Sequence, residues 1–185
     1  MATQPSLSPG AKPGDRTESV HAMIRVDQAG EYGATRIYAG QLAVLGDRHP
    51  AARAIHHMAS QEERHRAFFD RMIVERGVRP TLLQPFWNVA GFALGAVTAA
   101  IGPAAAMACT AAVETEIDKH YADQLRELGD SDPELSAAIA DFQAEELEHR
   151  DHALAAGAET TFGYPVLSGL IRLGCKVAIA AAKRI

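Results

Sequence analysis

The sequence predicts an all-α protein centred on a four-helix bundle that is built from two similar helix pairs. Three observations predict it. The chain is a tandem repeat with a period of about 83 residues. Each half carries a Glu-x-x-His pair within a run of helical periodicity, and glycine and proline mark the ends of these runs. No run of alternating β-branched residues competes with helix.

The two halves share two short phrases. One reads Glu-x6-Tyr-Ala-x-Gln-Leu and the other reads Glu-x-x-His, and each occurs once in each half. Residues three apart lie on the same face of a helix, so both members of each Glu-x-x-His pair point to one side. The repeat therefore selects six residues at matching positions: Glu31, Glu62 and His65 in the first half, and Glu114, Glu146 and His149 in the second.

These six residues match the ligands of a di-iron or di-manganese carboxylate centre in a ferritin-like four-helix bundle. Such a centre takes one glutamate from each of two helices and a Glu-x-x-His pair from each of the other two. Four carboxylates carry four negative charges, which two divalent ions neutralise. Without metal, each buried charge would cost several kcal/mol. We therefore expect all six residues to be metal ligands.

The helices of the first half are expected from about Thr17 to Leu45 and from Pro50 to Gly77. Thr17 suits the N-cap position, and Glu31 falls on the same stripe as the apolar residues before and after it. Pro50 suits the first turn of the second helix.

The helices of the second half are expected from Gly102 to Gly129 and from Ser131 to Gly157. Ser131 and Glu134 have the spacing of a capping box, with Pro133 in the first turn. The repeat halves then cover about residues 17–79 and 101–157 of one domain, residues 17–185. Residues 1–16 are rich in Pro, Ser and Gly, and we expect a disordered tail without a secretory signal or transit peptide.

Two segments lie outside the repeat. Residues 80–100 carry no charge, and we expect Phe86 to Ala100 to form a hairpin or short helix in a membrane interface, with Trp87 at headgroup depth. Residues 166–184 predict an amphipathic helix suited to an anionic membrane surface. Its apolar residues are Leu170, Leu173, Val177 and Ile179, and its basic residues are Arg172, Lys176 and Lys183. For these two segments, the alternatives to membrane contact are an ordinary fifth helix and a loop packed on the bundle, or a homodimer interface.

Composition limits the function classes. The chain has 185 residues, of which 48% are hydrophobic, enough for one domain with a sizeable core. A net charge of −5 and a pI near 5.9 argue against nucleic acid as a partner. Cys109 and Cys175 stand far apart in apolar surroundings, which indicates neither a disulfide framework nor a Cys-x-x-Cys site.

Other polar residues near the six are weaker candidates. Tyr38 and Tyr121 lie two turns beyond the lone glutamates, where they could line a substrate cavity, donate hydrogen bonds near the metals, or be ordinary core tyrosines. Asp27 could orient a ligand histidine, or could have a surface or capping role. The histidines outside the motif are expected to have surface or packing roles: His56, His57, His120 and His152.

Three stretches of the sequence closely resemble the demethoxyubiquinone hydroxylase family of ubiquinone biosynthesis. They are residues 24–34, 106–114 and 145–149, and the likeness extends from Ala22 to the C-terminus. The resemblance implies that the six repeat-selected residues are iron ligands. Gln28 departs from the histidine expected in many members, but it is not a ligand position.

The resemblance also implies an interfacial di-iron monooxygenase that hydroxylates the ring of demethoxyubiquinol. It implies two iron ions per chain, O2 as co-substrate, and NADH or another reductant, although the sequence contains no Gly-x-Gly-x-x-Gly. Expected partners are a polyprenylated quinone or quinol, the membrane surface, other ubiquinone-biosynthesis proteins and a second copy of the chain. We expect a peripheral protein on the cytoplasmic face of a bacterial inner membrane. The alternative is a ferritin-like or rubrerythrin-like protein that handles iron or scavenges peroxide.

Overall fold

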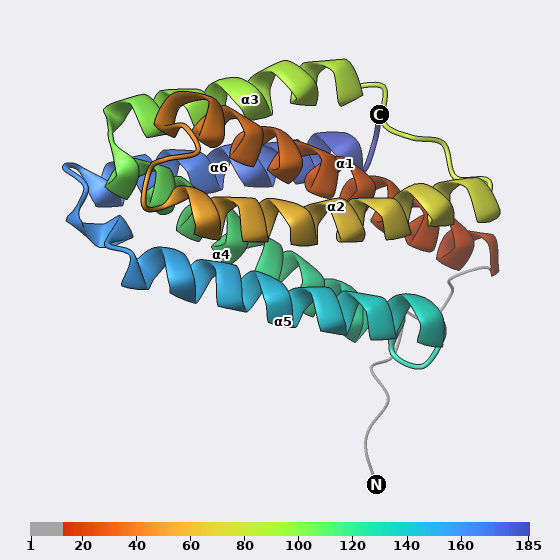
Figure 1. The fold of residues 1–185 in the computed structure, drawn as a ribbon. Coiled ribbons are helices and arrows are strands. Elements are labelled where there is room, and N and C mark those ends of the chain that lie inside the picture. The colour runs from red at the N-terminus through yellow and green to blue at the C-terminus, as the bar shows by residue number, and fades with distance from the viewer. Residues whose placement is uncertain (1–12) are drawn as a thin grey trace, which may run out of the picture.

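The computed structural model describes residues 13–185, and this part of the chain is all helical (Figure 1). The predicted all-α class is confirmed, with no strand in the described part. The predicted tail falls mostly outside it, and its disorder stays a prediction. The elements in order are α1 (Pro13–Leu45), α2 (Ala52–Glu75), α3 (Gln84–Ile101), α4 (Pro103–Leu128), α5 (Pro133–Ala155), the 3-10 turn η1 (Ala158–Thr160) and α6 (Tyr164–Ala182).

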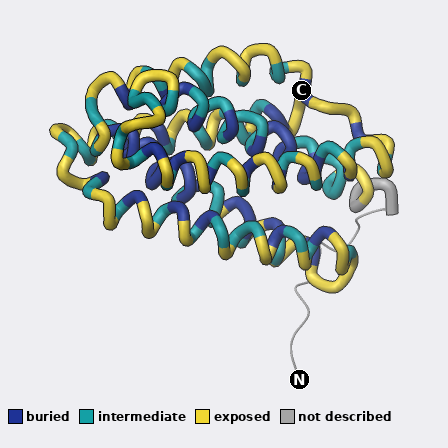
Figure 2. The backbone as a smooth tube through the Cα atoms, viewed as in Figure 1, coloured by how far each residue is buried: buried dark blue, intermediate teal, exposed yellow. Residues whose placement is uncertain are grey.

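Helices α1, α2, α4 and α5 form the bundle. The α1–α2 and α4–α5 pairs each come from one repeat half, and Figure 1 shows the first pair lying over the second. Figure 2 shows that the buried parts of these helices face the inside of the bundle. Their apolar residues form two clusters, one including Ile24 and Phe69 and the other including Tyr38 and Met58. Since Glu31 and Glu62 lie between these residues along α1 and α2, a polar layer separates the two clusters.

Three of the predicted helix starts are wrong in detail. Helix α2 begins at Ala52 with Ala51 at the N-cap position, so Pro50 lies in the turn before the helix and not in its first turn. Helix α1 begins at Pro13, so Thr17 lies inside the helix and does not cap it. Helix α5 is capped by Asp132, whose carboxylate accepts a hydrogen bond from the backbone N–H of Leu135 over 3.2 Å. Ser131 instead donates its hydroxyl to the carbonyl of Leu128. The reason is that Arg76 of α2 binds the Asp132 carboxylate and holds it at the helix end.

Helix α3 is a single helix, so the hairpin alternative for Phe86 to Ala100 is wrong. It packs along α1, and glycines make this approach close. A Cβ added at Gly91 or Gly95 of α3 would meet the backbone of α1, and one added at Gly40 of α1 would meet the backbone of α3. The two helices can therefore lie nearly backbone to backbone.

Helix α6 confirms the predicted C-terminal helix and packs on α4. Its bundle-facing side carries the buried residues Ser168 and Ile171, and beside them Arg172 donates to Glu116 of α4 over 2.6 Å. Its apolar residues Leu170, Leu173 and Val177 are exposed. Helix α6 is therefore apolar on two sides, one packed on the bundle and one exposed, whereas a helix of a water-soluble domain normally exposes a polar face.

Candidate metal centre

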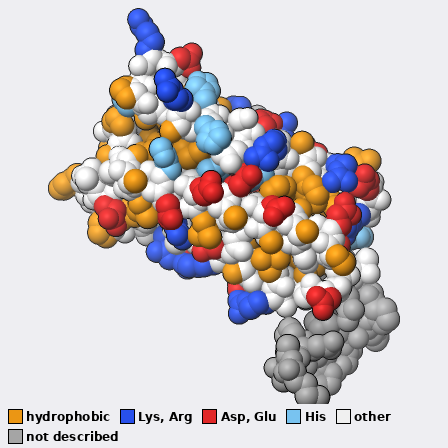
Figure 3. All heavy atoms as spheres, turned by 60° about the horizontal axis from the view of Figure 1, so that its bottom comes forward, with side chains coloured by type: hydrophobic (Ala, Val, Ile, Leu, Met, Phe, Trp, Pro, Cys, Tyr) orange, Lys and Arg blue, Asp and Glu red, His pale blue; other side chains and the backbone are white. Residues whose placement is uncertain are grey.

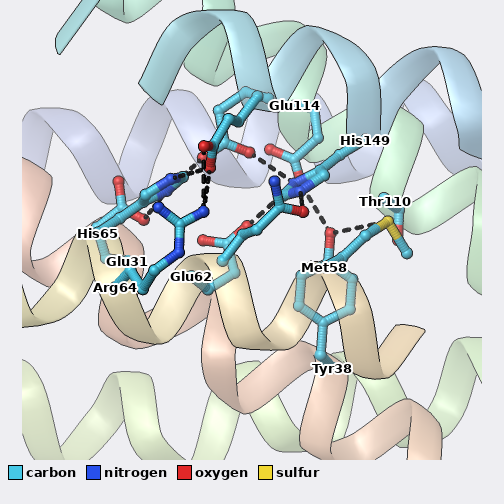
Figure 4. Close-up of polar contacts among 12 residues, drawn as sticks. Glu31, Tyr38, Met58, Glu62, Arg64, His65, Thr110, Glu114 and His149 are labelled. Carbon is cyan, nitrogen blue, oxygen red and sulfur yellow. Dashed lines mark hydrogen bonds and ion pairs between the residues drawn. The ribbon is translucent and has the colours of Figure 1, made fainter. Parts of the chain in front are cut away.

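The structure brings together all six residues that the repeat selected. Each helix of the bundle contributes to the cluster, and five of the six side chains are labelled in Figure 4. None of the six is more than 4% exposed. Neither imidazole faces bulk water. The six are Glu31 from α1, Glu62 and His65 from α2, Glu114 from α4, and Glu146 and His149 from α5.

The donor atoms form two overlapping groups, and within each group all of them lie within 4.8 Å of one another. Glu62 and Glu146 belong to both groups. Glu31 and His65 complete the first group, and Glu114 and His149 complete the second. Because two carboxylates are shared, the six residues could hold two adjacent metal ions, with Glu62 and Glu146 within reach of both.

The charges of the cluster also favour the binding of cations. Burial, together with the charge of Glu146, raises the pKa of Glu62 and of Glu114 well above the ordinary value. Burial alone would lower the pKa of His65, but hydrogen bonds with Glu146 and Glu31 raise it to about 10. Without metal, protons bound to Glu62, Glu114 and His65 therefore offset the negative charge of the cluster. Two divalent ions would neutralise the four carboxylates directly, so the donor set fits a dinuclear centre.

Tyr38 and Tyr121 each bind a carboxylate of the other repeat half. Tyr38 donates its hydroxyl to Glu114 over 3.2 Å, and Tyr121 donates to Glu31. Burial and the neighbouring carboxylates raise the pKa of both phenols, which therefore stay protonated as donors. Of the roles open to them, the structure shows the hydrogen bond near the metal positions.

The outer nitrogen of each cluster histidine also has a partner. His65 Nε2 lies 2.8 Å from a carboxylate oxygen of Glu145, and His149 Nε2 lies 3.0 Å from the side-chain oxygen of Gln61. Partial burial alone would raise the pKa of Glu145, but hydrogen bonds from His65 and Arg64 lower it. An N–H donated outward leaves the Nδ1 lone pair of each ring for a metal ion.

Sequence reasoning missed Gln61 and Glu145, although a signal was present: each directly precedes the first glutamate of a Glu-x-x-His pair. Neither of the two roles considered for Asp27, orienting a ligand histidine or lying at the surface or a helix cap, is seen. Asp27 is buried and accepts hydrogen bonds from His120 and Gln124, not from a cluster histidine. His120 is correspondingly buried, in a packing role.

The other histidines lie at the surface. His56 is exposed and pairs with Asp47. His57 and His152 line a polar pocket of about 890 Å³ between the α1–α2 turn and the end of α5. This pocket reaches Gln61 and His149, and Figure 3 shows histidines gathered near one end of the molecule. The cluster therefore approaches solvent on the His149 side.

An apolar groove lies among helices α1, α3, α4 and α6. It has a volume of about 460 Å³ and runs between α3 and α6 over α1, with Trp87, Leu94 and Ile171 among its walls. Three of its lining residues, Ala34, Ile37 and Val113, also line a space beside Tyr38 and Glu114 that is too small to hold a water molecule. Apolar side chains thus separate the groove from the edge of the cluster.

Comparisons with known proteins agree with this geometry. The family model described as ubiquinone biosynthesis protein COQ7 matches residues 18–182. The chain is 53% identical to the 3-demethoxyubiquinol 3-hydroxylase of Rhodospirillum rubrum, covering 94% of this chain and 82% of that protein. It is 50% identical to the human mitochondrial NADPH-dependent 3-demethoxyubiquinone 3-hydroxylase, covering 90% and 78%. It is 44% identical to the mitochondrial 5-demethoxyubiquinone hydroxylase of Saccharomyces cerevisiae, covering 88% and 77%.

Proposed function

This chain belongs to the family of the ubiquinone biosynthesis protein COQ7, and we propose that it hydroxylates the ring of demethoxyubiquinol with O2 at a buried di-iron centre. The observation that carries the proposal is the convergence of four glutamates and two histidines into two groups that share two carboxylates. The relatives are named as hydroxylases, so the comparisons do not favour the alternative of iron handling or peroxide scavenging.

The residues present fit two iron ions. Carboxylates and imidazoles suit iron that cycles between ferrous and ferric states. Glu62 and Glu146 would help to hold both ions, while Glu31 with His65 and Glu114 with His149 would each help to hold one. When bound, the iron would supply O2 activation and the redox change. The protein holds the donors in place through Tyr38, Tyr121, Gln61 and Glu145, and the apolar clusters on both sides exclude water.

The apolar groove suits the substrate's isoprenoid tail. Its walls are almost entirely hydrophobic side chains and glycines, which favours a hydrocarbon chain over a polar ligand. With the tail in the groove, the side chains of Ala34 and Val113 would have to move apart for the ring to reach Tyr38 and Glu114, because the space between them is too small for a water molecule. The ring would then face the metal position that His149 completes.

We propose that α3 and α6 form the surface that contacts the membrane. Both carry large exposed apolar side chains, among them Phe86 and Val89 on α3 and Leu170 and Leu173 on α6. Within residues 13–185, α6 is the one helix that is long and apolar enough to cross a membrane. Because the exposed stripes flank the groove, a tail could pass from the bilayer into it without crossing water. We place the protein at the cytoplasmic face of a bacterial inner membrane, as a peripheral protein.

The electron source that we propose is a nicotinamide nucleotide, NADH or NADPH. The support is the name of the human relative, which is NADPH-dependent. We also propose two kinds of protein partner: other ubiquinone-biosynthesis proteins and a second copy of the chain.

The test is reconstitution. The full chain is loaded anaerobically with ferrous iron and mixed with demethoxyubiquinol in liposomes, NADH and O2. Mass spectrometry should then show a product that is one oxygen atom heavier, labelled when 18O2 is used. A chain that binds about two irons without forming this product, or that accumulates many irons per chain, would contradict the proposal.

A further inference from the structure

The two repeat halves exchange partners across the cluster. Gln61 and Glu145 occupy the same repeat position, directly before the first glutamate of each Glu-x-x-His pair. Gln61 of the first half binds His149 of the second half, and Glu145 of the second half binds His65 of the first. The two contacts are alike in length, at 3.0 and 2.8 Å. The geometry is thus nearly two-fold.

The chemistry of the two contacts is different. Glu145 presents a carboxylate, and Arg64 binds the same group over 2.9 Å, which holds it in place beside His65. Gln61 presents a neutral amide. A carboxylate acceptor raises the basicity of a ligating imidazole more than an amide does, because it stabilises positive charge on the donated N–H. The two histidines are therefore unequal as donors although their positions are equivalent.

The surroundings of the two histidines also differ. His65 stacks on Phe142 with ring centroids 4.0 Å apart and is fully buried. On the other side, Gln61 and His149 line the polar pocket of about 890 Å³. Both imidazoles are buried and Glu145 is 28% exposed, so the stronger effect at His65 comes from the charge of its partner.

We propose that Gln61 and Glu145 are positioning residues that make the two metal positions unequal. The position completed by Glu31 and His65 holds its ion more tightly and favours the higher oxidation state, and the position completed by Glu114 and His149 holds its ion less tightly. This inference rests on the proposed dinuclear centre and goes beyond it, since a symmetric centre would serve the same ligand set.

The test exchanges the two partners. Glu145→Gln and Gln61→Glu are close in shape to the native residues, and the double variant reverses the arrangement. Glu63→Gln is the matched control, because it removes one carboxylate from α2 at a surface position paired with Arg66. Metal-free full-length protein is titrated anaerobically with Co2+ by calorimetry. The Co2+-loaded forms are then compared by proton NMR, in which each ligating imidazole contributes one exchangeable, hyperfine-shifted N–H signal.

The wild type should bind two Co2+ ions in unequal steps. Glu145→Gln should weaken the tighter step by about 10–100-fold and move one N–H signal, and Gln61→Glu should strengthen the weaker step and move the other. The double variant should again bind in two unequal steps, and Glu63→Gln should match the wild type.

Equal weakening of both steps in Glu145→Gln, or displacement of both N–H signals by either single variant, would overturn the inference and leave the dinuclear centre standing. A wild-type chain that binds no Co2+ would overturn the centre itself.

Discussion

Tyr38 on α1 donates a hydrogen bond to Glu114 on α4 over 3.2 Å, so a residue of one repeat half steadies a carboxylate of the other. Both side chains are almost fully buried. If the Tyr38 hydroxyl is removed, water cannot easily reach Glu114 to donate in its place, and the lost hydrogen bond costs free energy. We expect Tyr38→Phe to reduce the free energy of unfolding of the metal-loaded protein by about 1–3 kcal/mol. Urea denaturation measures this. Tyr32→Phe, at a side chain that lies near Arg66, is the control and should change little.

Glu146 belongs to both donor groups, whereas Glu31 belongs to one. We therefore expect Glu146→Ala to abolish hydroxylation and bind neither iron tightly, and Glu31→Ala to retain about one ion per chain. Both variants should keep a helical circular dichroism spectrum. Iron content and turnover are measured together, with Glu148→Ala, an exposed position on the same helix, as the control. Turnover retained in Glu146→Ala would remove this residue from the site.

The stability of the metal-free protein should fall as pH rises. Burial and the charge of Glu146 raise the folded-state pKa of Glu62, so the folded chain keeps a proton that the unfolded chain releases above about pH 4.5. For His65, whose folded-state pKa is about 10, stability is complete below the unfolded value of about 6.5 and is lost as pH rises through 10.

Divalent ions replace these protons, so the stabilisation by metal should grow with pH. Thermal melts with and without metal, between about pH 6 and pH 9, measure the two melting temperatures. A difference between the two melting temperatures that narrows toward high pH would contradict the assignment of these residues as metal ligands.

Asp132 joins the start of α5 to α2 by capping α5 and binding Arg76. We expect Asp132→Ala to cost about 1 kcal/mol for the cap alone, and more with the lost ion pair, whereas Asp132→Asn keeps the cap. Arg76 lowers the pKa of Asp132, so the ion-pair contribution is present above the unfolded value of about 3.9 and is lost as pH falls through the folded value. Urea titrations should show the difference between wild type and Asp132→Asn disappearing in acid.

Leu173 is 59% exposed on α6, so changing it disturbs little of the folded core. If α6 rests in a bilayer, Leu173→Glu removes about 1.5–3 kcal/mol of apolar insertion and should weaken binding to anionic vesicles by about 10–100-fold. Vesicle flotation measures this. Ala144→Glu adds the same charge at an exposed position on α5 and should bind as the wild type does. Equal binding by both variants would place the membrane contact elsewhere.

The sequence by itself determined the helical class, the order of the bundle helices and the six cluster residues. Its repeat carried this information, because a residue type that recurs at one helical phase in both halves must face the same interior. Helix ends were less determined. Ser131 and Asp132 are both good caps locally, and the choice of Asp132 depended on Arg76, which lies far away along the chain.

Only the tertiary structure decided which groups meet across the bundle. Local periodicity says which way Gln61 and Glu145 point along their own helices, but not that each reaches the histidine of the other half. It likewise shows α6 as amphipathic without saying which side faces the protein. In the fold, Ile171 packs against Val113 and Arg172 binds Glu116, and no local pattern encodes these contacts between distant segments.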